Sequence, residues 1–267
     1  MMKTILITGA GSGLGEGTAL ALARAGHKVI ATTEIWPQVT SLKEKARQQE
    51  LTLTVEKLDI TDKRDRDAVF SSYGHQVDIV VANAAIGETG ALAEIPVDRV
   101  RRVFETNVFS TLEFVQPYAR EFVERGKGKI VLTSSIAGFT TFPYLGPYVA
   151  SKHALEGMAQ LLYEELAPLG VKVATINPGP FRTGFNDRMY NTLDQWYDPD
   201  ACFTPEKPIR SVQQQFAGVD LQQDPAAMID EMARLIPLDE HRFRNVYPDS
   251  FEASAKEYQD GLWDRLI

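Results

Sequence analysis

The sequence has very little cysteine and no long hydrophobic run. Among its 267 residues there is one cysteine, Cys202, which excludes an intramolecular disulfide and any metal site built from cysteines. The four histidines are scattered without the spacing of metal ligands, so we expect no metal site. No apolar run approaches the roughly 18 residues of a membrane span, and the N-terminus lacks the pattern of a signal peptide. These absences favour a protein of the cytoplasm that does not enter a membrane.

Positive charge is also scarce. The chain has 28 basic and 36 acidic residues, a formal net charge of −8, and no run of Lys or Arg longer than two. A chain with this balance repels nucleic-acid backbones, so no nucleic-acid partner is expected. The apolar fraction of 44% and the charged fraction of 24% are ordinary for a globular protein. Because no linker interrupts the chain, we predict a single domain over residues 1–267.

Strand-like and helical patterns alternate through the first two-thirds of the chain. The predicted strands, several of which are continuous apolar runs typical of strands covered on both faces, are residues 4–8, 28–32, 51–58, 78–82, 129–133 and 171–176. The predicted helices between them are residues 14–25, 40–49, 63–73, 97–125 and 148–166. This alternation predicts an α/β fold of the Rossmann-like type, with a doubly wound parallel sheet.

The pattern changes after Thr183. Residues 184–225 are predicted to be irregular, and several aromatic residues lie there among many polar ones. Because a loop of this length in a compact domain is usually functional, we predict that it forms a substrate lid. Residues 226–267 are predicted to form a helix-strand-helix extension. Its first helix, residues 226–236, would begin with Asp224 as N-cap and Pro225 at the first helical position.

A glycine cluster follows the first predicted strand and opens a helix. The literal G-x-G-x-x-G string is absent, and the pattern present is T-G-x-x-x-G-x-G. A pyrophosphate can approach a backbone closely where no Cβ intervenes, and the helix N-terminus offers it free N–H groups. In this position the cluster favours dinucleotide binding over a simple chain reversal. The predicted cofactor contacts from this turn are Thr8, Gly9, Gly11, Ser12, Gly13, Leu14 and Gly15.

Tyr148 and Lys152 stand four residues apart at the start of a predicted helix, a spacing that places both on one side of it. A tyrosine is a useful acid or base near neutral pH only if its pKa of about 10 is lowered. An ammonium about 4 Å away favours the phenolate by roughly 3 pKa units at an effective dielectric constant of ~20, and desolvation opposes this effect. We therefore expect a pKa somewhat above neutral, which would suit proton exchange with an alcohol or ketone.

A serine completes a more specific combination. Ser135 lies 13 residues before Tyr148, at the end of a predicted strand. In the order and spacing of the glycine turn, this serine and the Tyr-x-x-x-Lys pair, the sequence resembles the short-chain dehydrogenase/reductase family of the single-domain type. The resemblance covers roughly residues 3–183.

The resemblance implies catalytic roles. Tyr148 would be the general acid/base, and Lys152 would lower its pKa and hold the nicotinamide ribose. Ser135 would bind the substrate oxygen, with Ser134 as the alternative. Asn107 matches the family asparagine that bends a helix and holds a proton-relay water.

Three further segments match the family's cofactor-binding pattern. Asn83 matches the last Asn of the Asn-Asn-Ala-Gly element, from which this sequence departs at Ala82 and Ala85. Asp59 matches the acidic residue near the adenine ring, although a turn or N-cap aspartate is the alternative. Thr183 would hydrogen-bond the nicotinamide carboxamide. The contacts implied by these segments are Asp59, Ile60, Asn83, Ala84, Ala85, Pro178, Gly179, Phe181 and Thr183.

The end of the second predicted strand bears on the choice of nicotinamide cofactor. NAD-preferring members of the family usually carry an acidic residue there, and NADP-preferring members carry an arginine. The usual acid position falls on Thr33 and the usual arginine position on Glu34, so neither rule is met. A carboxylate at Glu34 would repel a 2′-phosphate, although Glu34 could instead only cap the next helix. We therefore favour NAD(H) over NADP(H), with Thr33 and Glu34 as contacts.

The aromatic residues of the predicted lid, together with Phe139, Phe142 and Tyr144, suggest an apolar or aromatic alcohol or ketone as substrate. The alternative is that these rings pack the lid on its own scaffold. The family pairs its subunits through the helices that match residues 97–125 and 148–166, so a homodimer or homotetramer is expected.

Two other functions remain open on the same fold. One is a cofactor-sensing regulator that has lost its chemistry, and the other is a nucleotide-sugar epimerase or dehydratase. The intact Tyr148–Lys152 pair argues against the first. The chain length and the glycine spacing argue against the second.

Overall fold

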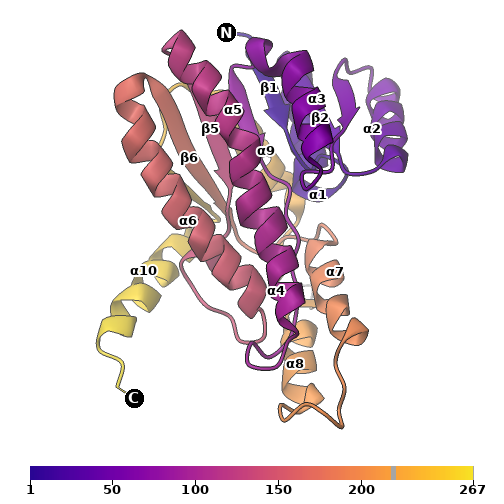
Figure 1. Cartoon of the computed structure of the whole chain (residues 1–267), viewed down its shortest axis with the longest axis vertical. Coiled ribbons are helices and arrows are strands. Elements are labelled where there is room, and N and C mark those ends of the chain that lie inside the picture. The colour runs from indigo at the N-terminus through magenta and orange to yellow at the C-terminus, as the bar shows by residue number, and fades with distance from the viewer. Residues whose placement is uncertain (218–220, 267) are drawn as a thin grey trace.

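Seven parallel strands form the centre of the molecule (Figure 1). Across the sheet their order is β3 (Thr54–Lys57), β2 (Lys28–Thr33), β1 (Thr4–Ile7), β4 (Ile79–Ala82), β5 (Gly128–Thr133), β6 (Val171–Pro178) and β7 (Arg244–Tyr247). Every pair of neighbouring strands is parallel. The chain builds outward from β1 to β3 and then returns to place β4 on the other side of β1. The strand order therefore reverses between β1 and β4, as in the predicted doubly wound fold.

The computed structural model describes residues 1–217 and 221–266. Residues 218–220, in the segment predicted as a lid, and Ile267, at the end of the predicted domain, lie outside the described residues. Within the described part of the chain, no helix is long and apolar enough to cross a membrane.

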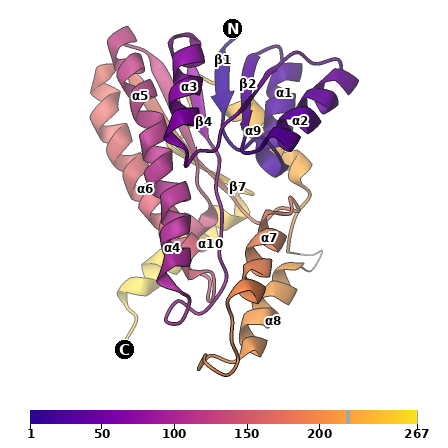
Figure 2. The same ribbon diagram turned by 45° about the vertical axis from the view of Figure 1, so that its right-hand side comes forward.

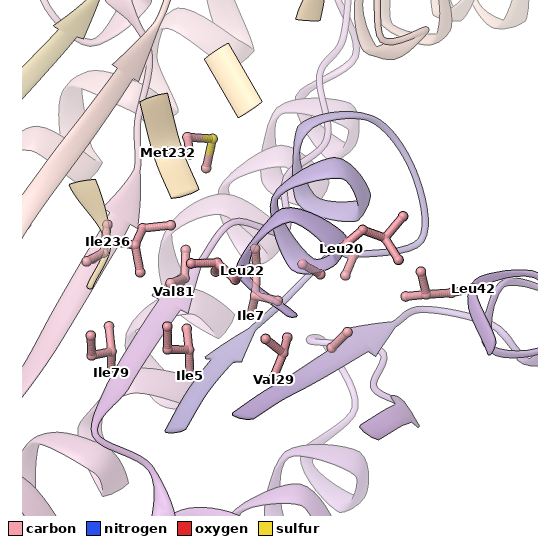
Figure 3. Close-up of a cluster of buried hydrophobic side chains, with 14 of the residues drawn as sticks. Ile5, Ile7, Leu20, Leu22, Val29, Leu42, Ile79, Val81, Met232 and Ile236 are labelled. Atoms are coloured by element: carbon pink, nitrogen blue, oxygen red, sulfur yellow. The ribbon is translucent and has the colours of Figure 1, made fainter. Parts of the chain in front are cut away.

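Helices cover both faces of the sheet, and neighbouring residues of β1 point to opposite faces. Ile5 and Ile7 belong to a buried cluster formed with α1 (Gly13–Arg24), α2 (Trp36–Gln48) and α9 (Pro225–Leu235), which is drawn in Figure 3. Leu6 belongs to the cluster on the other face, which α3 (Lys63–Tyr73), α5 (Ser110–Arg125) and α6 (Gly146–Leu166) complete. Each face of the sheet therefore has its own hydrophobic core.

The helix predicted over residues 97–125 is interrupted. It consists of α4 (Val97–Phe104), a π-helical turn (Glu105–Phe109) and α5. Within the turn, the side chain of Asn107 accepts a hydrogen bond from the Ile86 N–H and donates one to the Ile86 carbonyl, each at 2.9 Å. These bonds to a neighbouring loop hold the wider turn in place, since a π turn is rare on its own.

The prediction of irregular structure for residues 184–225 was wrong. The segment contains α7 (Phe185–Asn191), a 3-10 turn (Thr192–Gln195) and α8 (Glu206–Ala217). The helices are short and largely polar, and the buried apolar side chains among the described residues of the segment are Met189, Tyr190, Leu193 and Ile209. Because the apolar positions are so few, the helical period is not visible in the sequence. Figure 2 shows α7 and α8 beyond the end of the sheet.

The C-terminal extension begins with α9, which lies over the sheet next to α1. Asp224 caps α9, because its carboxylate accepts a hydrogen bond from the Ala226 N–H at 2.8 Å. β7 and α10 (Ser250–Trp263) follow. α9 packs on α1, and the fully buried Met232 of α9 lies with its sulfur 3.5 Å from the Thr18 hydroxyl of α1. The extension is therefore part of the core rather than an appendage.

Met232→Ala is predicted to lower the free energy of unfolding by about 2–5 kcal/mol, because it leaves a cavity between α9 and α1. Chemical denaturation monitored by circular dichroism measures the change. Met2→Ala, at an exposed position, should leave the stability unchanged. If Met232→Ala also left it unchanged, the extension would not belong to the core.

Candidate active site

A cleft of about 770 Å³ lies at the carboxyl ends of the strands. The segments that follow six strands, β1 to β6, all contribute to its walls. In open α/β sheets this edge is where ligands bind, at the point where the strand order reverses. The predicted site residues that line the cleft are Gly9, Gly11, Ser12, Gly13, Leu14, Gly15, Glu34, Asp59, Ile60, Asn83, Ala84, Ala85, Ser135, Tyr148, Lys152, Pro178, Gly179, Phe181 and Thr183.

Three predicted site residues do not line the cleft. Thr8 is buried beneath it, and its hydroxyl accepts hydrogen bonds from the N–H groups of Asn83 and Ala84 at 2.9 and 3.0 Å. Thr33, the last residue of β2, is fully buried, so its side chain cannot make the predicted contact with a cofactor. Asn107 is buried behind the cleft wall. Thr8 and Asn107 therefore position the residues around them, and Glu34 rather than Thr33 faces the cleft.

The glycine turn fits the phosphates of a dinucleotide. A Cβ at Gly9 would lie 2.8 Å from the Ala84 Cα, and a Cβ at Gly15 would lie 2.4 Å from the Gly9 carbonyl oxygen. Gly13 has a φ of 59°, in the left-handed region that favours glycine. Ser12, the N-cap of α1, makes no capping hydrogen bond with its side chain. The first N–H groups of α1 therefore remain available to an anion in the cleft.

Ser135 and Tyr148 meet in the cleft. Tyr148 lies in the first turn of α6, and its phenol hydrogen-bonds the Ser135 hydroxyl. Ser135 also accepts a hydrogen bond from the Ala137 N–H at 3.1 Å, which fixes its side chain at the start of a short 3-10 turn. The neighbouring Ser134 hydroxyl is buried and has no hydrogen-bond partner among the described residues. The geometry thus favours Ser135 over Ser134 as the partner of the tyrosine.

Lys152 lies one turn beyond Tyr148, and its ammonium is 5.6 Å from the centre of the tyrosine ring. The Nζ atom donates a hydrogen bond to the Thr133 carbonyl, at the end of β5, at 2.8 Å. Burial lowers the pKa of Lys152 to about 8, and the Glu156 carboxylate acts in the opposite direction.

Burial raises the pKa of Tyr148 to about 12, and the hydrogen bond with Ser135 offsets this only in part. The pKa of Tyr148 therefore lies well beyond the expected value somewhat above neutral. The four-residue spacing does place Lys152 on the same face of α6 as Tyr148. The Lys152 ammonium, however, donates its hydrogen bond to the Thr133 carbonyl and not to the phenol oxygen, so it does not offset the effect of burial on the phenol.

Asn107 connects two walls of the cleft. In addition to its two bonds with Ile86, its Nδ2 atom donates to the Ser151 hydroxyl at 2.9 Å. Ser151 directly precedes Lys152 in α6. The loop after β4 and α6 are thus held together by one buried amide. A π-helical turn interrupts the helix at Asn107, and the bend and the bound water expected there stay predictions.

Comparison with known proteins identifies the family. Residues 3–194 match the family described as short chain dehydrogenase. This chain belongs to that family.

Two curated relatives share much of the sequence. An uncharacterized oxidoreductase, YusZ, from Bacillus subtilis is 38% identical over 189 residues, which cover 68% of this chain and 66% of the relative. A diacetyl reductase of the (S)-acetoin-forming type from Staphylococcus epidermidis is 31% identical over 194 residues, which cover 71% of this chain and 75% of the relative. Both matches leave part of each relative uncovered.

One solved structure shows the same fold over nearly the whole chain. It is a short chain dehydrogenase/reductase from Burkholderia phymatum in complex with NAD, with a TM-score of 0.82 and 23% identity. The likeness covers 99% of this chain and 96% of that one.

The far end of the cleft, next to Tyr148, is apolar. Phe185 of α7 packs on the tyrosine, with the ring centres 5.4 Å apart. Phe142, Leu145, Met189 and Tyr190 also line this end. The segment with Phe142 and the segment of residues 184–225, in which the sequence predicted substrate contacts, therefore both reach the cleft.

Not every aromatic residue that was predicted to contact the substrate lies at this end of the cleft. Trp196 packs instead against Gly90 and donates a hydrogen bond to the Thr89 carbonyl at 3.1 Å. Neither Phe139 nor Tyr144 lines the cleft. For these side chains the alternative interpretation, packing within the scaffold, is the better one.

Sequence reasoning missed several polar residues of the lining, among them Gln38 and Arg102. Gln38 of α2 lies over the glycine turn, so that a Cβ at Gly11 would be 2.5 Å from its side chain. Arg102 of α4 is bound to Glu88, a carboxylate with no exposed surface. No pattern in the neighbouring sequence predicts that Gln38 or Arg102 lines the cleft, because this depends on how α2 and α4 pack in the fold. Among the described residues, no cluster of His, Cys, Asp and Glu could hold a metal ion.

The cofactor-free chain is predicted to show no tyrosinate signal from Tyr148 below about pH 11, since the pKa of this phenol is raised to about 12. The measurement is the ultraviolet absorbance of the wild type minus that of Tyr148→Phe, titrated from pH 7 upward. A difference signal with a midpoint near pH 7 or 8 would contradict the dominance of burial.

Proposed function

We propose that this chain is an oxidoreductase that transfers a hydride between NAD(P) and a carbonyl compound or secondary alcohol. The observation that carries the proposal is the convergence of Ser135, Tyr148 and Lys152 on one end of a cleft whose other end is the glycine turn. The family supports an oxidoreductase, and the diacetyl reductase among its relatives supports a small ketone or alcohol as substrate.

In this proposal the chain supplies binding, orientation and a proton. A nicotinamide, when bound, supplies or accepts the hydride. The Ser135 hydroxyl holds the substrate oxygen, and the Tyr148 phenol donates its proton to that oxygen during reduction. Lys152 holds the nicotinamide ribose and favours the phenolate that remains after proton transfer. Asn107 ties α6 to the loop that follows β4, and it thereby keeps Tyr148 and Lys152 aligned with the rest of the cleft.

The raised pKa of Tyr148 suits the direction of reduction. A phenol with a pKa of about 12 is fully protonated at neutral pH and is therefore ready to donate. Oxidation of an alcohol needs the phenolate first, so that direction is expected to gain rate as the pH rises.

The charges of the cleft support NAD over NADP. Glu34 lines the cleft beyond the end of β2. The basic residues in the described lining are Arg102, Lys152 and Arg188, which come from α4, α6 and α7 rather than from the β2–α2 edge. A 2′-phosphate beside Glu34 would meet a like charge without a cationic partner.

The apolar wall around Tyr148 supports an apolar or aromatic alcohol or ketone. Met189 and Tyr190 are buried in a cluster with Leu145, and Phe142 and Phe185 pack against it. We propose that α7 and α8 form the substrate lid, because α7 supplies part of this wall. Dimer or tetramer formation in the cytoplasm also belongs to the proposal. Exposed apolar side chains on the outer faces support the pairing of subunits, among them Phe109 and Leu161, which are 54% and 57% exposed.

Tyr148→Phe is expected to reduce turnover of ketones by at least about 100-fold, because general acid catalysis contributes roughly 10²–10⁴. Its affinity for NADH should change little, since the ring remains. The measurement is the loss of NADH absorbance with diacetyl and a panel of apolar ketones.

Tyr163→Phe is a matched control, because Tyr163 is a half-exposed residue on the same helix that does not line the cleft. Full turnover by Tyr148→Phe would contradict the mechanism. Binding of NADH by the wild type without turnover of any ketone would instead favour the cofactor-sensing alternative.

A further inference from the structure

A second buried charge lies on the catalytic helix. Glu156 of α6 stands one turn beyond Lys152, and both residues are almost fully buried, with 4% and 3% of their surface exposed. Residues four apart share a helix face, so the carboxylate lies on the side of α6 that carries Tyr148 and Lys152. The mechanism above does not use Glu156.

Two strands hold the carboxylate in place. Asn177 of β6 donates from its Nδ2 atom to Oε1 at 2.5 Å, and Arg244 of β7 donates from Nε to Oε2 at 2.9 Å. The space for it is left by Gly138, where a Cβ would lie 2.7 Å from the Cγ of Glu156. Asn177 also donates to the Ser135 carbonyl at 3.4 Å. The network therefore runs from the edge strand to the serine of the site.

Lys152 has few other groups to support its charge. Its ammonium donates to the neutral Thr133 carbonyl. Among the residues that the structure describes, the titratable groups that face it are Tyr148 and Glu156, both from α6. The strand β6 and the π turn contribute Asn177 and Asn107 to this region, and neither titrates. A buried ammonium is costly unless a counter-charge offsets the loss of hydration, and Glu156 is the carboxylate that favours the charged form.

We propose that Glu156 is a positioning residue, whose carboxylate keeps Lys152 charged while Asn177 and Arg244 hold that carboxylate beneath the Ser135 turn. This inference rests on the proposed function for its catalytic consequence. The effect of Glu156 on the charge of Lys152 does not depend on that function or on a bound nucleotide. Arg244 limits the effect, because its positive charge competes for the same carboxylate.

The test is the titration of Lys152 in Glu156→Gln. The chain is labelled with ¹³C at the lysine ε-carbon, and the Lys152 signal is assigned by its loss in Lys152→Arg. In the chain without nucleotide, Glu156→Gln should move the Lys152 midpoint to lower pH by about 1 unit, as expected for loss of one nearby charge in a partly screened site. The alkaline limb of kcat/KM for ketone reduction should move the same way.

Two variants separate charge from structure. Arg244→Gln removes the competing positive charge and should move the midpoint to higher pH, opposite to Glu156→Gln. Glu156→Asp keeps the charge and should stay near the wild-type midpoint. Glu165→Gln, the same change at an exposed position of α6, is the matched control and should move nothing.

A role in packing alone predicts a different result. Glu156→Gln would then lose stability or rate at every pH while the Lys152 midpoint stayed in place, and this result would overturn the inference. The titration of Lys152 needs no turnover. If the Lys152 midpoint shifted in Glu156→Gln while the wild type reduced no ketone, the proposed function would be overturned and the electrostatic role of Glu156 would stand.

Discussion

All strands of the sheet run in one direction, and the site depends on this constraint. Parallel strands deliver the ends of β1 to β6 to the same edge, where each following segment adds a wall of the cleft. The glycine turn and Ser135 are far apart in sequence, yet both directly follow strands and therefore meet at this edge. A parallel sheet needs helices on both faces. The two hydrophobic cores that result hold the edge in a fixed shape, and the C-terminal α9 completes one of them.

Burial shifts the pKa values of Tyr148 and Lys152. The surroundings that shape the cleft raise the pKa of Tyr148 and lower that of Lys152, so both groups are pushed toward their neutral forms. Hydrogen bonds and charges oppose this effect at each position, from Ser135 for the phenol and from Glu156 for the ammonium. In the proposed mechanism, the protonation states of Tyr148 and Lys152 thus depend on residues behind the cleft wall. Asn107 and Asn177 belong to the same supporting layer, because their amides connect the loops and strands that carry the reacting groups.

Short sequence patterns, each made of a few neighbouring residues, predicted most of the fold and the central residues of the cleft. Apolar runs located the strands, Asp224 and Pro225 located the start of α9, and four-residue spacing placed Tyr148 and Lys152 on one face. Features that arise from packing between distant segments were not predictable in this way. The π turn at Asn107 depends on bonds to another loop, and α7 and α8 have too few apolar positions to show a helical period. The same limit explains Thr33, which is buried because both faces of β2 are covered, and the direction of the Lys152 ammonium.

We propose that this edge of the sheet binds a nicotinamide dinucleotide in the cleft. Thermal unfolding of the chain with NADH, with NADPH and with neither tests it most directly. A ligand at 100 times its Kd adds about 2.7 kcal/mol to the folded state, which corresponds to roughly 5–10 °C for a domain of this size. We expect such a shift with NADH and a smaller one with NADPH, because Glu34 would repel the additional phosphate. A chain whose unfolding temperature moved with neither nucleotide would contradict the account.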